Sequence, residues 1–246
     1  MFAGHYGASL ALKKIEKDAP LGQLFLAAQF IDVLWGGFVL AGVERVEVAP
    51  QLPSSPLIMS FIPFTHSLPG ALFWSGLVWL IVRFLPVPLL RAAKESKTRN
   101  RVALALSAGV FSHWLLDLLV HRPDLGLIGN EAKVGLSLYD YPFLAFSLEA
   151  LVLVAGMGWY LRSTKGSGLL GKYGMVFFGG FLLLVNALTY WGPVPPQPWM
   201  IAIFNEVFYF SMALIAGWLG KKRVANDEAL TKFKATSSPF ESNLAS

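Results

Sequence analysis

The stretch VALALSAGVFSHWLLDLLVHRPD, residues 102–124, combines a membrane-length apolar run with three regularly spaced ionisable residues. His113, Asp117 and His121 follow one another at intervals of four. Residues four apart on an α-helix project from the same side of it. Ionisable groups in an apolar segment are costly and commonly mark function. The stretch therefore predicts a membrane helix that presents metal-ligating groups to its neighbours, or groups that hydrogen-bond to them.

The whole chain has the composition of an integral membrane protein. Its 246 residues are 55% hydrophobic and 14% charged, with a mean hydropathy of +0.55, whereas soluble domains carry about 25% charged residues. The net charge of +5 comes largely from short Lys and Arg runs between apolar segments. Such runs follow from the positive-inside bias of membrane proteins, so we expect no nucleic-acid partner. With no cysteine, a metal could be bound only by imidazole, carboxylate and water.

Apolar windows of about 20 residues predict how often the chain crosses the bilayer. Six are found, near residues 20–43, 57–85, 102–121, 142–161, 173–191 and 199–219. Basic loops alternate with Pro-rich, weakly charged ones, which places both termini in the cytoplasm. We therefore expect an all-α, polytopic membrane helix bundle of about six transmembrane helices over residues 1–220, in the cell inner membrane.

The two ends of the chain differ from this pattern. Residues 1–14 are predicted to form a short re-entrant or interfacial helix with Lys13 and Lys14 at the membrane surface. Residues 221–246 are polar and are predicted to be a disordered cytoplasmic tail.

Helical rise converts sequence position into depth, at about 1.5 Å per residue. Counted from the presumed cytoplasmic ends, seven polar residues fall in one layer near the middle of the bilayer: Asp32, His66, His113, Asp117, Glu149, Asn186 and Glu206. His5 joins them if the N-terminal helix is re-entrant. Pro63 predicts a kink in the second span beside His66. These positions predict a water-accessible polar chamber inside the bundle.

Four short motifs occur in the first half of the chain: GHYG with His5, FIDVLWG with Asp32, FTHSLPGAL with His66, and SHWLLD with His113 and Asp117. In this order they resemble the membrane-bound metal-dependent hydrolase family, whose regulated bacterial members are under LexA control. The resemblance covers residues 1–125. It implies that His5, Asp32, His66, His113 and Asp117 are the metal-site residues, with a divalent metal, zinc first, as the cofactor.

The chemistry expected of such a site is hydrolysis. Histidine and carboxylate ligands that leave one position open allow a metal to lower the pKa of a bound water toward about 7. Glu149 or Glu206 is the candidate catalytic group, as a general base or as a residue that orients a ligand. A chamber open to the bilayer suits a membrane lipid, a phosphodiester or another small molecule as substrate. Arg122 could pair with a phosphate group of that substrate.

Two other functions are compatible with the same residues. A proton- or cation-coupled transporter would use the buried carboxylates and histidines to carry charge. A non-catalytic scaffold would use them only as hydrogen bonds between helices. His121 is followed by Arg-Pro-Asp, so a cap at the helix end is favoured over metal ligation for this residue.

Overall fold

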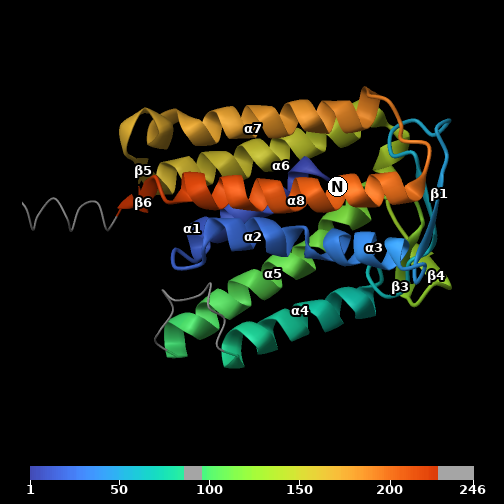
Figure 1. Ribbon diagram of the computed structural model, residues 1–246, viewed down its shortest axis with the longest axis horizontal. Helices are drawn as coiled ribbons and strands as arrows, with labels where there is room; N and C mark the ends of the chain where they lie inside the picture. Colours follow the sequence, from blue (N-terminus) through green and yellow to red (C-terminus); the bar gives the residue numbers. More distant parts are fainter. Residues whose placement is uncertain (86–95, 227–246) are drawn as a thin grey trace, which may run out of the picture.

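The computed structural model describes residues 1–85 and 96–226, in which α-helices lie side by side along the long axis of the molecule (Figure 1). The helices are α1 (Ala3–Ile15), α2 (Leu21–Ala28), α3 (Phe30–Leu40), α4 (Leu68–Phe84), α5 (Ser96–Val120), α6 (Pro142–Ser163), α7 (Gly168–Trp191) and α8 (Pro198–Gly220). A 3₁₀ helix, η2 (Leu138–Asp140), precedes α6.

Short antiparallel strand pairs lie at the two ends of the bundle (Figure 1). At one end, β1 (Arg45–Val48) pairs with β2 (Leu57–Phe61), and β3 (Leu125–Ile128) pairs with β4 (Ala132–Val134). At the other end, β5 (Thr164–Gly166) pairs with β6 (Arg223–Ala225).

Within the described residues, four helices are long and apolar enough to cross a membrane: α5, α6, α7 and α8. Together α2 and α3 pass the same test, but they are bent by 53° at a break beside Gln29. The apolar helix α4 is shorter, at 17 residues. The chain is thus a mostly helical membrane protein with four such helices, or five with the bent pair, and six spans are not confirmed.

The segment expected to be the second span begins differently from the prediction. Residues 57–61 form β2, and α4 starts only at Leu68. The Ser67 hydroxyl accepts a hydrogen bond from the backbone N–H of Gly70 at 3.0 Å, and Pro69 lies in the first turn. Both are typical of a helix start. Pro63 therefore precedes the helix instead of kinking it, and His66 lies in the loop that leads into α4.

The chain beyond residue 220 also departs from the prediction. Arg223 in β6 donates hydrogen bonds to the Thr164 hydroxyl at 2.9 Å and to the Thr164 carbonyl at 2.9 Å, so the first residues of the expected tail belong to the fold. The rest of that tail, residues 227–246, lies outside the described residues, as do residues 91–95 of the expected basic loop.

The short helix α1 is enclosed by the bundle. Its residues His5, Tyr6 and Leu10 are fully buried. A Cβ atom on Gly156 of α6 would lie 2.1 Å from the carbonyl oxygen of Gly7, so the two helix backbones touch at this point. Apolar side chains of α1, α2, α6, α7 and α8 form the largest core around this contact, among them Leu10, Phe25, Leu153, Tyr160, Phe178 and Tyr209. This packing fixes α1, and with it His5.

The contact between α1 and α6 generates a stability prediction. Gly156→Ala places a methyl group against the backbone of Gly7 and should lower the free energy of unfolding by about 1–3 kcal/mol. The control is Gly158→Ala on the same helix, where a Cβ atom meets nothing within 4 Å. Thermal unfolding of the detergent-solubilised full chain measures both. Equal midpoints for the two variants would contradict the close approach.

Candidate metal centre

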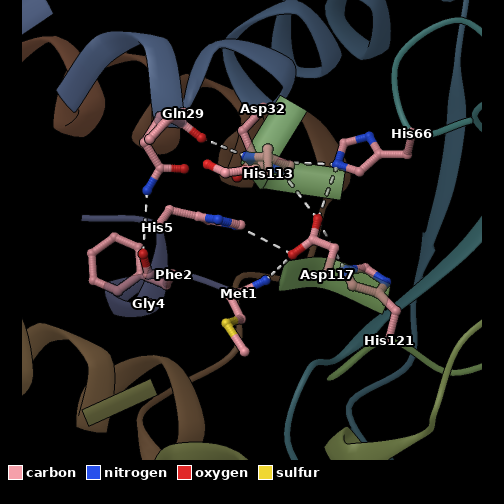
Figure 2. A network of polar contacts seen from close by, with 12 residues as sticks. Met1, Phe2, Gly4, His5, Gln29, Asp32, His66, His113, Asp117 and His121 are labelled. Atoms are coloured by element: carbon pink, nitrogen blue, oxygen red, sulfur yellow. Dashed lines mark hydrogen bonds and ion pairs between the residues drawn. The ribbon is translucent and has the colours of Figure 1, made fainter. Parts of the chain in front are cut away.

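Side chains from four parts of the chain converge in the middle of the bundle (Figure 2). α1 contributes His5, α3 contributes Asp32, the loop before α4 contributes His66, and α5 contributes His113 and Asp117. Asp32 is the one partly exposed member, with 17% of its side chain accessible, and the other four are buried. All five residues that the resemblance implies as ligands therefore lie together.

Four of these side chains have donor atoms within 4 Å of one another in histidine–aspartate pairs. Nε2 of His113 lies 3.1 Å from Oδ2 of Asp117 and 3.5 Å from Oδ1 of Asp32. Nε2 of His66 lies 3.2 Å from the same Asp32 oxygen and 3.8 Å from Oδ2 of Asp117. Donors arranged tetrahedrally around zinc at bond lengths of 2.0–2.2 Å are about 3.4 Å apart. The observed separations lie on both sides of this value.

The other oxygen of Asp117 faces α1. Its Oδ1 lies 3.2 Å from Nε2 of His5 and also contacts the amino group of Met1. The rings of His5 and His113 stack with their centroids 3.9 Å apart. His5, His113 and Asp117 thus form a second possible ligand set beside that of Asp32, His66 and His113. His113 belongs to both sets.

His113 has only one nitrogen to offer. Its Nδ1 lies 2.7 Å from the carbonyl oxygen of Ala28 and donates a hydrogen bond to it, which leaves Nε2 as the ligand atom. The two sets therefore compete for the same nitrogen. This geometry favours one cation, with His5 at its edge.

The buried donor atoms of this cluster could hold a metal ion. Nδ1 of His5 is buried and makes no hydrogen bond to the described residues, and Nε2 of His5 and of His113 lie against carboxylate oxygens of Asp117 and Asp32 at 3.1–3.5 Å. A buried polar atom left without a partner costs about 1–3 kcal/mol. Imidazole and carboxylate donors in one buried cluster are ligands that zinc prefers, so a bound ion would remove this cost.

Contacts around the cluster orient its members. The Tyr209 hydroxyl of α8 donates to Oδ2 of Asp32 at 2.9 Å and leaves Oδ1 directed at the histidines. On the other side, the backbone N–H of Gly126 in β3 donates to the carbonyl of His66 at 3.2 Å. Such outer contacts commonly fix ligand orientation in metal sites.

His121 also belongs to this cluster, although the sequence favoured a helix-end cap for it. It follows the last residue of α5, but its side chain is buried and its Nε2 lies 3.7 Å from Oδ2 of Asp117. Its Nδ1 lies 3.0 Å from the Asp124 carboxylate. The four-residue spacing from Asp117 was the signal in the sequence that placed His121 on the same side of the helix. The Arg-Pro-Asp that follows it was given more weight and favoured a cap at the helix end.

Glu149 holds the start of α1. Its carboxylate accepts hydrogen bonds from the backbone N–H of Phe2 at 2.7 Å and of Gly4 at 3.3 Å, and from the Tyr190 hydroxyl at 2.9 Å. A carboxylate at a helix N-terminus is favourable because the unpaired N–H groups there carry positive partial charge. Asn186, expected in the same layer, is buried without a side-chain hydrogen bond to the described residues.

Two other charged groups were assigned roles from the sequence. Glu206 of α8 is partly buried and lies against α3, where a Cβ atom on Gly36 would be 2.6 Å from its Oε1. Gly36 is one helical turn after Asp32, so Glu206 is close to the exposed side of the cluster. Arg122, expected to meet a phosphate, donates instead to Asp140 at 2.7 Å and to the carbonyl of Ser55 at 3.2 Å.

Comparison with known proteins identifies no relative that shares this site. No family model, no curated protein and no solved structure matches the chain. The likeness to membrane-bound metal-dependent hydrolases therefore stays a prediction that depends on the four short motifs.

The geometry of the centre predicts how zinc affinity responds to mutation. The detergent-solubilised full chain should bind about one zinc per molecule, and His113→Ala should abolish this binding. Tyr209→Phe removes only the bond to Asp32 and should weaken zinc binding about 10-fold. Tyr173→Phe, at an exposed position on α7, is the matched control. Elemental analysis and zinc titration measure these effects, and unchanged zinc content in His113→Ala would contradict the assignment.

Proposed function

We propose that the protein is a membrane-embedded, metal-dependent hydrolase of the zinc type that acts on a lipid or another phosphodiester. The observation that carries this proposal is the convergence of buried histidines and aspartates whose donor atoms are spaced for one cation. The proposed ligands are Asp32, His66, His113 and Asp117, with His5 beside them. The four motifs that resemble the hydrolase family contain these same residues.

The protein's own side chains would divide the work of such a reaction. When bound, zinc supplies a water of lowered pKa and polarises the bond to be cleaved. Asp32 and Asp117 balance the charge of the cation, and His66 and His113 complete its binding. His66, His113 and Asp117 are buried away from bulk water, which strengthens their interactions, and Asp32 is the one partly exposed member.

Glu206 is the better of the two candidate general bases. Glu206 is partly buried and its carboxylate lies against Gly36, one helical turn from Asp32, the partly exposed member of the cluster. The Glu149 carboxylate already accepts three hydrogen bonds from α1 and Tyr190. We therefore assign Glu149 chiefly to holding α1 in place and Glu206 to accepting a proton.

The membrane arrangement is part of the proposal. We propose that α4 and the bent α2–α3 pair also cross the bilayer, so that six segments span it, with α1 enclosed as a re-entrant helix. The ends of the helices beside β5 and β6 carry the basic residues Arg83, Arg99, Arg101, Arg162 and Lys221 (Figure 1). By the positive-inside rule this end, where α1 ends and β6 lies, faces the cytoplasm of a cell whose inner membrane holds the protein, while the amino group of Met1 lies inside the bundle against Asp117.

The proposal predicts an order of effects on turnover of lipid phosphodiesters in detergent. His113→Ala and Asp117→Ala should abolish hydrolysis in protein that remains folded, because each removes a ligand. Glu149→Gln weakens the support of α1 and should cost a milder 10- to 100-fold or so. Product release from a panel of lipid phosphodiesters, with circular dichroism as the folding control, measures this order.

A different outcome would favour transport. Reconstituted in vesicles, a transporter would lose proton-coupled flux in Glu149→Gln and Glu206→Gln but keep it in His113→Ala. That result would replace the hydrolase proposal. A protein that binds zinc but shows neither hydrolysis nor flux would be a scaffold with a structural metal site.

A further inference from the structure

Glu44 is a buried carboxylate that the proposed reaction does not use. It lies between α3 and β1, and its side chain is 1% exposed. Its Oε1 accepts hydrogen bonds from the backbone N–H groups of Phe64 and Thr65, both at 2.9 Å. Its Oε2 accepts the hydroxyl of Thr65 at 2.6 Å. Buried carboxylates need hydrogen-bond donors, and this one accepts three hydrogen bonds from the loop that carries His66. Glu44 is therefore an integral part of the structure of that loop.

The hydroxyl of Thr65 connects this acid to the metal centre. Its Oγ1 also lies 2.9 Å from Nδ1 of His66. A hydroxyl has one hydrogen to donate, and a carboxylate can only accept, so the Thr65 hydrogen goes to Glu44. The remaining contact is satisfied only if Nδ1 of His66 carries a hydrogen and donates it to Oγ1.

This chain of hydrogen bonds places a hydrogen on Nδ1 of His66, the tautomer that a cation at Nε2 requires. A neutral ring with its hydrogen on Nδ1 has a free lone pair on Nε2. That nitrogen lies 3.2 Å from Oδ1 of Asp32 and 3.8 Å from Oδ2 of Asp117. Lone pairs that face one another in a buried cluster repel unless a cation lies among them, so this tautomer is the one suited to metal binding.

We propose that Glu44 is a positioning residue of the metal centre, which acts through Thr65 to keep Nε2 of His66 unprotonated and directed at the cation. The inference rests on the proposed metal site and extends it to a residue outside the motifs. Acids that orient ligand histidines are common in metal sites. Here the acid acts through an intervening hydroxyl.

The substitution Glu44→Gln separates this role from simple support of the loop. The amide oxygen can keep both backbone N–H bonds, because the two N–H groups meet the same carboxylate oxygen. The amide NH₂ then faces Oγ1 of Thr65 and donates to it. The Thr65 hydrogen turns to Nδ1 of His66, and the ring hydrogen moves to Nε2, where it opposes the cation.

Two measurements on the full chain in detergent test the proposal. The ¹⁵N shifts of histidine in zinc-loaded protein report which ring nitrogen of His66 carries the hydrogen, with its signals assigned from His66→Ala. Titration with Zn²⁺ and with Co²⁺, whose absorption reports coordination geometry, gives the affinity. Glu44→Gln should move the hydrogen from Nδ1 to Nε2 and weaken zinc binding about 10- to 100-fold. Glu47→Gln, at an exposed position on β1, should change neither.

Variants of Thr65 test the same connection if Glu44→Gln does not fold. Thr65→Ser keeps the hydroxyl and should retain the tautomer and the affinity, whereas Thr65→Val keeps the shape and should lose both. In the double variant, Glu44→Gln should add no further loss to Thr65→Val, because the two act through one chain.

The outcomes separate this inference from the proposed function. An unshifted tautomer and unchanged zinc affinity in Glu44→Gln, or in Thr65→Val, would overturn the role of Glu44 and leave the metal centre standing. A wild-type chain that binds neither zinc nor cobalt would overturn the metal-dependent hydrolase. That result would overturn the role of Glu44 with it, whereas zinc binding that does not respond to Glu44→Gln would overturn the role of Glu44 alone.

Discussion

The carboxylate of Asp117 is the group around which the buried parts of this protein are arranged. It lies within an apolar helix, where an unpaired charge would cost several kcal/mol. Four histidines and the amino group of Met1 surround its two oxygens, and they come from the N-terminal segment, the loop before α4, α5 and the residue that follows α5. The helices can pack closely only if they bring these partners to it. The position of α1, fixed by its backbone contact with α6, meets that requirement for His5.

Much of the cluster could be predicted because its signals are local. The four-residue spacing of His113 and Asp117 on one helix depends only on helix geometry, and the rarity of ionisable groups in apolar segments singled out Asp32. The sequence could not predict which ring nitrogen each histidine directs into the cluster, because the ring orientation depends on contacts with residues distant in sequence. The carbonyl of Ala28 sets the orientation of His113 from 85 positions away, and Tyr209 reaches Asp32 from 177 positions away.

The errors in the fold have a different origin. Hydropathy windows cannot distinguish a short apolar strand from the start of a helix, so β2 was counted as part of the second span. The cap formed by Ser67 and the proline in the next turn were the local signals for a later helix start. The bend at Gln29 has no such signal. The amide of Gln29 donates to the carbonyl of Phe2 at 3.3 Å, a tertiary contact that sequence patterns do not show.

Hydrogen bonds join the strand pairs β1–β2 and β3–β4 into one connected plate at one end of the bundle. Lys133 of β4 donates to the carbonyl of Met59 in β2, and Ser54 is bonded to the carbonyl of Tyr139 before α6. The same plate bonds to the backbone of His66 through Gly126. A nanobody that grips the β3–β4 hairpin would therefore pull on a ligand of the buried centre. A binder at this end of the bundle could therefore disturb the buried cluster without contacting any of its side chains.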